Sequence, residues 1–505
     1  MSLAKLPSAV VDGITAEPVM VEVDVATGLP GFVMVGLADK AVEESRERVR
    51  SAIKHSGYQF PLSRITVNLA PSEKKKSGVH FDLPIALGIL LADDQLESNE
   101  AFKNTLIIGG LSLDGGLQAI TGTLSLVEWA AKNGYRKVIL PAANYHEAAL
   151  IKNIELTPVT TLVEAISAVG GALFDAPAAS KKAKTDSELD ADWLQIQGQA
   201  QAKRAALIAA AGGHNLLLEG PPGAGKTLLA RGLRALLPPL GADELIEVVK
   251  LHSVAGRIAH HQPLETLSRP FRSPHHTASQ IAIVGGGTSP RPGEISLAHR
   301  GVLFLDELPE FQRSVLEGLR QPLEDNQIHV SRIHSAVSYP ADFLLVATMN
   351  PCPCGWLGSS QKDCVCSLHQ INQYRKKISG PILDRIDLFL KVPAVTLGEL
   401  KANKADVAEL TALRLAIAES QKLQKKRNSG RLNSALKGRK IAEICVTDAA
   451  ADQLIEQAAA KFVMSGRSFH KLLKTARTIA DLNGQAVIGA PEVAEAIRYR
   501  FSESD

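Results

Sequence analysis

Alternating and continuous runs of apolar residues divide the first part of the chain into strands and helices. Apolar and polar side chains alternate over residues 19–25, and short apolar runs occur at residues 65–69, 106–108 and 137–140. These patterns predict strands, with helical segments between them. We therefore expect an α+β domain over residues 1–172.

The pattern changes after this region. Residues 173–191 are small, polar and charge-mixed and contain Pro177, which is typical of a linker. A second α/β pattern covers residues 192–395, and residues 396–505 are rich in Ala, Leu, Lys and Glu, which favour helices. A chain of 505 residues exceeds what one hydrophobic core usually serves. The predicted fold is therefore an α/β multidomain protein with three domains.

A glycine-rich loop follows the apolar strand at residues 216–218 and precedes a helical run. The loop and the first helical residues are Gly220, Pro221, Pro222, Gly223, Ala224, Gly225, Lys226, Thr227 and Leu228. In a phosphate-binding loop the backbone amides and the helix N-terminus hold phosphate oxygens, the lysine reaches the outer phosphates and the threonine ligates magnesium. The strand and helix on either side argue against a glycine-rich turn that binds nothing. The sequence thus predicts a site for ATP and Mg²⁺.

Two later strands end in polar residues that suit the same chemistry. Residues 302–305 lead into Asp306 and Glu307, which fit a magnesium ligand and a group that polarises the attacking water. Residues 343–347 lead towards Asn350, whose amide would orient that water or sense the γ-phosphate. A solvated strand end and a strand-capping asparagine are the alternatives.

With these motifs, the whole chain closely resembles the ComM (YifB) type of magnesium-chelatase-like AAA+ ATPase. Three further segments carry the resemblance: Phe-Asp-Leu-Pro-Ile-Ala at 81–86, Phe-Arg-Ser-Pro-His-His at 271–276 and Ala-Arg-Thr-Ile-Ala-Asp at 476–481. The resemblance implies an AAA+ core with a parallel sheet, a C-terminal helical lid and a homo-oligomer, a hexameric ring. It also implies a DNA translocase or helicase that drives branch migration of recombination intermediates in natural transformation (competence).

The resemblance also assigns roles to two arginines. Arg385 matches the arginine finger of the magnesium chelatase and minichromosome maintenance branches, where a guanidinium stabilises the transferring phosphoryl group on a neighbouring subunit. An ion pair within the chain, to Asp384 or Asp387, is the alternative. Arg467 resembles the sensor 2 arginine, and Arg477 is the other candidate for that role.

The first domain resembles the Lon protease domain, whose catalytic dyad is a serine and a lysine. When residues 77–83 are aligned with the nucleophile segment, Gly78 takes the place of the serine and Ser125 falls about where the lysine would be. Only Ser77 beside Lys76 leaves a peptidase open. We therefore expect a scaffold or a DNA-contacting collar.

Local charge, rather than the net charge of +3, supports DNA as a partner. Residues 420–442 hold eight basic and no acidic side chains, a stretch suited to phosphate contacts although such runs are usually solvated surface. The best candidates are Lys425, Lys426, Arg427 and Arg431. By analogy with related helicases, residues 327–338 would form a pore hairpin with Arg332 pointing inward.

Four of the five cysteines fall within fifteen residues: Cys352, Cys354, Cys364 and Cys366. Four thiolates would hold a structural Zn²⁺ ion in a closed tetrahedral site that staples the loop after Asn350. Reduced, unliganded thiols are the alternative, and His369 is a possible substitute ligand. The adjacent His275 and His276 would seldom converge on one metal ion.

The remaining composition narrows the function classes. With 45% hydrophobic and 22% charged residues the chain is typical of globular proteins. The apolar stretch at residues 83–92 is too short to span a bilayer and the start lacks a secretory signal, so we expect no membrane segment and a cytoplasmic protein. Besides a DNA translocase, a chelatase motor subunit and an ATP-dependent peptidase or protein remodeller are the competing functions.

Overall fold

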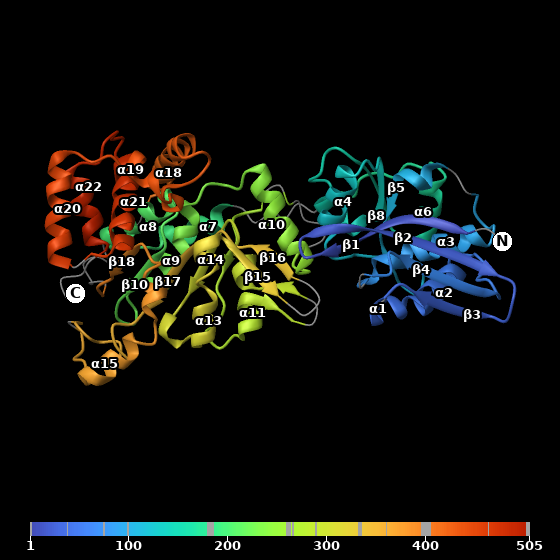
Figure 1. Ribbon diagram of the computed structural model, residues 1–505, viewed down its shortest axis with the longest axis horizontal. Coiled ribbons are helices and arrows are strands. Elements are labelled where there is room, and N and C mark those ends of the chain that lie inside the picture. Colours follow the sequence, from blue (N-terminus) through green and yellow to red (C-terminus); the bar gives the residue numbers. More distant parts are fainter. Residues whose placement is uncertain are drawn as a thin grey trace. The chain divides into compact units, whose positions relative to one another are not determined.

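The chain forms two compact units in the computed structural model (Figure 1). The N-terminal unit comprises Met1–Ala183 and Ala242–Leu267, and the ATPase unit comprises Lys184–Gly241 and Ser268–Asp505. The structure describes residues 3–37, 39–73, 76–97, 100–178, 186–258, 264, 267–287, 290–331, 336–359, 361–394, 406–462 and 464–500. Among these residues, no helix is both long enough and apolar enough to cross a membrane.

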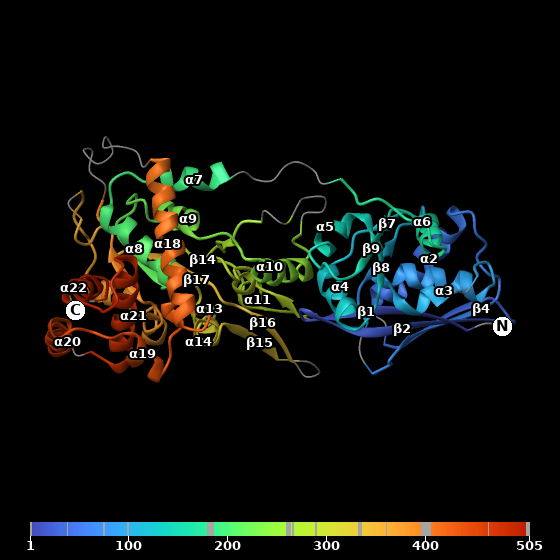
Figure 2. The same ribbon diagram turned by 90° about the horizontal axis from the view of Figure 1, so that it is seen from above.

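A four-stranded sheet and the helices packed on it form the first half of the N-terminal unit. The sheet has the order β1-β2-β4-β3, antiparallel except for the β3–β4 pair. Its strands are β1 (Ala4–Asp12), β2 (Thr15–Ala26), β3 (Gly31–Val35) and β4 (Arg64–Ala70), and the helices are α1 (Lys40–Glu43), α2 (Ser45–His55) and α3 (Asp82–Ala92). Because α3 is apolar on all sides, it lies fully buried between α2 and the sheet (Figure 2). The strands predicted at residues 19–25 and 65–69 are confirmed as parts of β2 and β4.

A parallel three-stranded sheet, β5-β8-β9, forms the second half. The strands of this sheet are β5 (Thr105–Ile107), β8 (Lys137–Pro141) and β9 (Glu155–Val159). The same half also contains the strand pair β6 (Gly110–Leu111) and β7 (Leu117–Gln118) and the helices α4 (Thr123–Lys132), α5 (Tyr145–Ala148) and α6 (Leu162–Val169). The strands predicted at residues 106–108 and 137–140 correspond to β5 and β8.

A segment from the middle of the chain completes this unit. Helix α10 (Ala242–Val254) packs against α4, where Lys250 forms an ion pair with Glu128. Its Ser253 hydroxyl donates to Glu147 at 2.6 Å, and burial raises the pKa of Glu147 to about 7. The sequence pattern placed residues 192–395 in one domain, whereas this helix buries an apolar face in the N-terminal unit.

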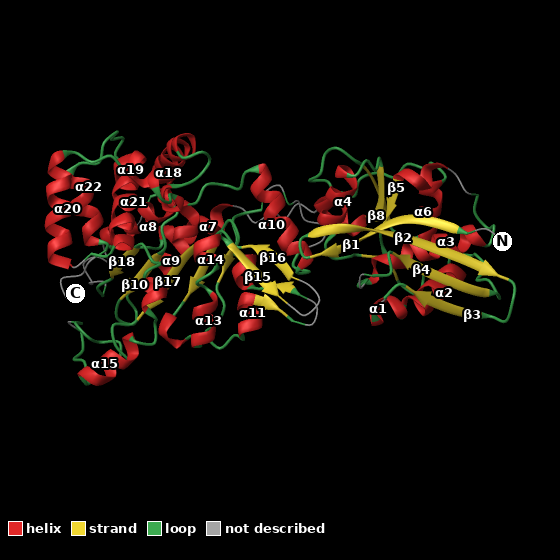
Figure 3. Cartoon of the chain, in the orientation of Figure 1, coloured by secondary structure: helices red, strands yellow, loops and turns green. Residues whose placement is uncertain are grey.

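The ATPase unit is built on a five-stranded parallel sheet of order β11-β14-β17-β10-β18. Figure 3 labels three of these strands, β17, β10 and β18. Its strands are β10 (Leu216–Glu219), β11 (Phe271–Arg272), β14 (Val302–Leu305), β17 (Leu344–Met349) and β18 (Leu388–Lys391). Strands β14 and β17 are buried at every position, because hydrophobic clusters cover both faces of the sheet.

Helices and short hairpins surround this sheet. They are α7 (Asp186–Leu194), α8 (Ala200–Gly212), α9 (Lys226–Leu236), α11 (Gln280–Val284), β12 (Gly285–Gly286), β13 (Arg291–Pro292), α12 (Glu294–Leu297), α13 (Arg313–Gly318), α14 (Pro322–Asp325), β15 (Gln327–Ser331), β16 (Ala336–Pro340), α15 (Leu368–Arg375) and α16 (Gly380–Leu383). The C-terminal helices are α18 (Val407–Arg427), α19 (Arg439–Ile444), α20 (Ala449–Phe462), α21 (Gly466–Leu482) and α22 (Ala490–Arg498). Figure 2 shows α18 beside α8 and α9, so the helical region belongs to the same compact unit as the sheet.

Part of the expected linker is helical. Residues 186–191 begin α7, which packs closely on α9. The fully buried Trp193 lies against Gly232, where a Cβ would come within 3.2 Å of the Trp193 Cα. The absence of a side chain at Gly232 lets α7 pack closely on α9, a contact that the polar composition of residues 173–191 does not indicate.

Candidate nucleotide-binding site

The candidate site lies at one edge of the parallel sheet, where three strands end. Strand β10 leads into the glycine-rich loop, β14 into Asp306 and Glu307, and β17 into Asn350. Neighbouring parallel strands present their carboxyl ends at the same edge, which is the usual ligand site of such sheets. The topology therefore brings together the residues that the sequence singled out.

Lys226 is at the centre of this group. Its ammonium donates to the carbonyl oxygens of Gly220 at 2.5 Å and Pro221 at 3.0 Å and to the side-chain oxygen of Asn350 at 3.1 Å. Burial lowers the pKa of Lys226, while the nearby carboxylate of Asp306 acts in the opposite direction. The lysine thus joins the loop after β10 to the residue after β17.

The hydroxyl of Thr227 donates to Asp306 at 3.2 Å, which places two hard oxygen donors next to each other. Thr348, within the apolar strand β17, donates its hydroxyl to the other oxygen of Asp306 and accepts the backbone N–H of Glu307 at 3.0 Å. Oxygen ligands of this kind suit Mg²⁺. The sequence reasoning missed Thr348, although a polar residue in a buried strand is a usable signal.

Glu307 has a left-handed backbone conformation, with φ 55°, and a half-exposed side chain. The Nδ1 atom of His276 lies 3.9 Å from its carboxylate. Besides their place in a family segment, the sequence suggests only a metal site as a chemical role for His275 and His276; the structure instead places His276 beside Glu307. In the described part of the chain, neither histidine belongs to a group that converges on a metal position.

Gln199 is a second residue that the sequence did not reveal. Its side-chain amide donates to the carbonyl of Ala224 in the glycine-rich loop at 2.5 Å. It precedes α8, far from the loop in sequence and with φ 50°. The loop is therefore held in place from outside as well as by Lys226.

The four cysteines of the predicted metal site converge. The Sγ atom of Cys352 lies 3.4 Å from that of Cys354 and 3.6 Å from that of Cys364, and all four sulfurs are within 4.8 Å of one another. Sulfurs about 2.3 Å from a tetrahedral zinc ion are about 3.8 Å apart, so the donor set fits zinc. Hydrogen bonds from the backbone of Trp356 and Val365 lower the pKa of Cys354 to about 6, which favours the thiolate.

This cysteine loop packs on the glycine-rich loop. A Cβ at Gly355, which has φ 83°, would lie 2.7 Å from the Cδ atom of Pro222 and 3.9 Å from the Cγ atom of Asn350. Only a glycine fits this approach without displacing its neighbours. The candidate metal site is therefore in direct contact with two parts of the nucleotide site.

Arg385 is paired within its own chain. Its guanidinium lies 2.5 Å from the carboxylate of Glu324 and donates to the carbonyl oxygens of Arg320 at 3.1 Å and Pro381 at 2.6 Å. The sequence alternative named Asp384 or Asp387 as its partner, but the partner is Glu324.

The two candidates for sensor 2 differ sharply in their surroundings. The side chain of Arg467 is 64% exposed and lies 3.7 Å from Glu324. Arg477 is 1% exposed, forms an ion pair with Asp481 and donates to the carbonyl of Ala486. Arg477 is therefore paired within the helical region, whereas the guanidinium of Arg467 reaches the surface.

One of the proposed nucleic-acid contacts is already paired within the chain. Lys425, Lys426, Arg427 and Arg431 are all exposed, but the guanidinium of Arg427 lies 2.7 Å from the carboxylate of Asp481. Strands β15 and β16 pair as an antiparallel hairpin, as expected from the sequence. Arg332 lies outside the described residues.

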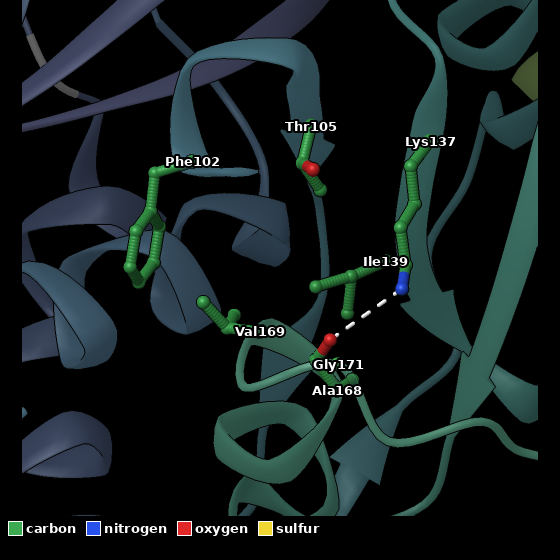
Figure 4. Close-up of a pocket in the computed structure, with 7 residues that line it drawn as sticks. All are labelled: Phe102, Thr105, Lys137, Ile139, Ala168, Val169 and Gly171. Atoms are coloured by element: carbon green, nitrogen blue, oxygen red, sulfur yellow. Dashed lines mark hydrogen bonds between the residues drawn. The ribbon is translucent and has the colours of Figure 1, made fainter. Parts of the chain in front are cut away.

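Of the residues that bear on the peptidase alternative, Lys76 and Ser125 donate hydrogen bonds to the backbone. Lys76 is buried and its ammonium donates to the carbonyl of Pro71, while the hydroxyl of Ser125 donates to the carbonyl of Ile14 at 2.8 Å. A separate small cavity of about 70 Å³ in this unit lies beside Phe102, Ile139 and Lys137 (Figure 4). Lys137 donates to a backbone carbonyl there, and none of the predicted site residues lines the cavity.

Three family models match the chain: "Magnesium chelatase, subunit ChlI" over residues 192–400, "Subunit ChlI of Mg-chelatase" over 21–144 and "Magnesium chelatase, subunit ChlI C-terminal" over 409–500. The competence protein ComM of Haemophilus influenzae is 42% identical over 99% of this chain and 98% of its own length. The YifB protein of Escherichia coli is 41% identical over 99% and 97%, respectively. The chain belongs to the ComM (YifB) family of magnesium-chelatase-like AAA+ proteins.

Membership of this AAA+ family implies ATP and Mg²⁺ as ligands, and the geometry fits both. The loop after β10 offers backbone amides at a helix N-terminus for phosphate, and Thr227 and Asp306 supply oxygen donors for the metal ion. A partial relative, the magnesium-chelatase 67 kDa subunit of Heliobacterium mobile, is 28% identical over 31% of this chain and 27% of its own.

Proposed function

We propose that this protein is a hexameric, cytoplasmic, ATP-driven DNA translocase that promotes branch migration of recombination intermediates during natural transformation. The observation that carries the proposal is the full-length similarity to a competence protein, with 42% identity over 99% of the chain. The assembled nucleotide site supports the ATP-driven part of the proposal, because Lys226 is already bonded to Asn350 and Thr227 to Asp306.

In this proposal the residues of the sheet edge divide the work. ATP would supply the phosphoanhydride bond that water cleaves, and a bound Mg²⁺ ion would neutralise charge on the phosphate oxygens. Lys226 and the backbone N–H groups of the loop, which Pro221 and Pro222 lack, would hold the phosphates, while Thr227 and Asp306 would hold the metal ion. Glu307 orients and polarises water, and Asn350 fixes its position.

Two arginines complete the proposed reaction. Arg385 acts on the nucleotide of the neighbouring subunit, which makes hydrolysis depend on assembly of a ring. Arg467, at the start of α21, reports the state of the nucleotide to the C-terminal helices. Both side chains carry a permanent positive charge suited to the phosphoryl group that transfers.

We also propose that Cys352, Cys354, Cys364 and Cys366 hold a structural zinc ion. Four thiolates close the coordination shell, so the ion would perform no chemistry itself. Its role would be to fix the loop whose Gly355 packs against Pro222. For DNA, the candidate contacts are the hairpin β15–β16 and the exposed Lys425, Lys426 and Arg431.

The decisive experiment measures ATP turnover of the full chain with single strands, duplexes and branched junctions. A translocase predicts that DNA raises turnover and that DNA binding weakens steeply with salt. Lys425→Ala combined with Lys426→Ala should reduce the DNA response, whereas Lys461→Ala, on α20, is the matched control. ATP turnover that is the same with and without every form of DNA tested would refute the proposal.

The matches to chelatase subunits favour one second candidate, the motor subunit of a magnesium-inserting chelatase. It predicts ATP turnover that is independent of DNA and changes when the other subunits of a magnesium chelatase are added. The same turnover assay therefore separates the two functions.

A further inference from the structure

Glu324 contacts both candidate arginines of the ATPase unit. Its carboxylate lies 2.5 Å from the guanidinium of Arg385 and 3.7 Å from that of Arg467. The hydrogen bond from Arg385 is the main reason that the pKa of Glu324 falls below its ordinary value, and the charge of Arg467 adds to it. One anionic side chain thus faces two cations that are remote from each other in sequence.

The guanidinium of Arg385 is engaged on all three nitrogens. Besides Glu324, it donates from Nε to the carbonyl of Arg320 and from Nη1 to the carbonyl of Pro381, and only 9% of the residue is exposed. A phosphate of another subunit would have to replace the carboxylate of Glu324 before it could accept a hydrogen bond from Nη2 of Arg385. In this arrangement the chain supplies its own anion to the proposed finger.

Glu324 also lies at the base of the hairpin β15–β16. It belongs to the single-turn helix α14, and Asn326, in a left-handed conformation with φ 56°, is the only residue between that helix and β15. The carbonyl of Asn326 accepts the N–H of Ala341, directly after β16, at 2.8 Å. Glu324 is therefore connected to β15 through two residues and to the end of β16 through the hydrogen bond between Asn326 and Ala341.

The hairpin is anchored rather than loosely attached. Ile328 and Tyr339 pair across its two strands and are both buried, and the Tyr339 hydroxyl donates to the carbonyl of Pro290 at 2.9 Å. Lys437 of the C-terminal region donates to the carbonyl of Glu324 at 2.9 Å. A displacement of the hairpin would consequently move the backbone that carries Glu324.

We propose that Glu324 is a latch that restrains Arg385 and Arg467 until the hairpin is displaced. A nucleic-acid strand that pushes on β15–β16 would withdraw the carboxylate and free the guanidinium for a neighbour's phosphate, which forms strong charge-assisted bonds. The inference rests on the proposed function, because it requires Arg385 to act in phosphoryl transfer. Glu324 is a positioning residue in this scheme and does not contact the reacting atoms.

Glu324→Gln tests the latch, since the amide keeps the shape of the side chain and removes its charge. Turnover without DNA should rise by about two- to fivefold, the factor expected for loss of a partly exposed ion pair. Stimulation by DNA should shrink by a similar factor, because the restraint that DNA relieves is already gone. Glu317→Gln is the matched control: Glu317 pairs with the side chain of Arg320 at 2.9 Å, so this variant should behave like wild type.

The double variant Glu324→Gln with Arg385→Ala identifies the released group. It should be as slow as Arg385→Ala alone, since the gain depends on that guanidinium. Glu324→Asp, which keeps the charge but shortens its reach, provides a second variant and should give an intermediate gain. Basal turnover of Glu324→Gln that equals or falls below wild type, in rings of normal size, would overturn the latch.

The two arms of the experiment separate this inference from the proposed function. The basal arm contains no DNA, so a wild-type protein that ignores DNA would refute the translocase and leave the latch measurable. A basal gain that persists in the Arg385→Ala background would refute the latch and leave the translocase intact.

Discussion

The nucleotide edge of the sheet and the arginine-bearing segments belong to the same compact unit but differ in how complete they are. At the edge, Lys226 is bonded to Asn350 and Thr227 to Asp306, so groups that are proposed to act together are already in contact. On the arginine side, Arg385 is buried and bonded to Glu324 of its own chain. A single chain therefore brings together the residues proposed to hold ATP and Mg²⁺, whereas the proposed finger is paired with a carboxylate of its own chain.

The difference follows from the elements that carry each group. Carboxyl ends of adjacent parallel strands meet at one edge whatever the rest of the chain does. Arg385 follows the short helix α16 and Arg467 lies in the first turn of α21, so sheet pairing places neither of them. Substitutions on the two sides should therefore differ in whether a second subunit can rescue them.

The largest expected effect is that of removing the finger. Arg385→Ala should lower turnover about 10³-fold, since an arginine finger contributes at least that much to phosphoryl transfer. ATP binding by the same variant should persist, because the sheet edge is unchanged. The measurements are steady-state turnover and equilibrium binding of a fluorescent ATP analogue.

Rescue between subunits makes this test specific. Arg385→Ala subunits keep an intact phosphate loop, and Lys226→Ala subunits, which should not bind or hydrolyse ATP, keep an intact finger. Mixed rings should regain part of the activity wherever the two intact parts meet. Intact mixed rings that show no recovery would contradict action across a subunit boundary.

The next effect concerns the base on the preassembled side. Glu307→Gln should lower turnover by about 10²-fold or more, as expected for loss of a general base, and leave ATP binding close to wild type. Glu310→Gln is the control: it follows the same strand and pairs with Lys377 at 3.1 Å, and it should remain active. Equal losses in the two variants would show that this strand end matters only for structure.

Local patterns in the sequence predicted the preassembled side well and the long-range contacts poorly. The strand before Gly220, the acids after β14 and the cysteine pairs are short-range signals, and the structure places them as expected. By contrast, Gln199 bonds to Ala224 and Glu324 to Arg385, residues that lie far away in sequence. A local pattern of polar and apolar residues does not predict such pairs. The docking of α10 in the N-terminal unit likewise depends on a partner surface that the helix itself does not specify.

A third prediction asks whether the cysteine loop supports the preassembled side. The wild-type chain should bind one zinc ion. The Cys352→Ser variant should not bind zinc, and its ATP turnover should be about tenfold lower than that of the wild type. The expected loss corresponds to one misplaced hydrogen bond to a charged group, because Gly355 would no longer brace Pro222 and Asn350. Metal analysis and turnover are measured on the same samples. Cys445→Ala, outside the cluster, should keep the zinc ion, and turnover that survives metal loss would separate the two loops.

The smallest expected effect is a pH dependence on the arginine side. Lys471 of α21 lies 3.0 Å from the carboxylate of Asp387 and donates to the carbonyl of Ile386, next to Arg385. Burial lowers the pKa of Lys471 to about 8. Burial alone would raise the pKa of Asp387, but Lys471 and His214 hold it well below its ordinary value. Near neutral pH the lysine is therefore the partner whose charge changes.

The sign of the effect follows from these directions. Below about pH 8 the ammonium of Lys471 holds the two residues that follow Arg385, Ile386 and Asp387. As pH rises from 7 to 9, Lys471 loses its proton and with it the ion pair with Asp387. Turnover should then fall by about fivefold, the effect of one weakened contact. Lys471→Arg keeps its charge across this range and should flatten the decline, whereas titration of the nucleotide and of the sheet edge affects both proteins equally. An identical decline in the two proteins would show that the finger segment does not depend on this lysine.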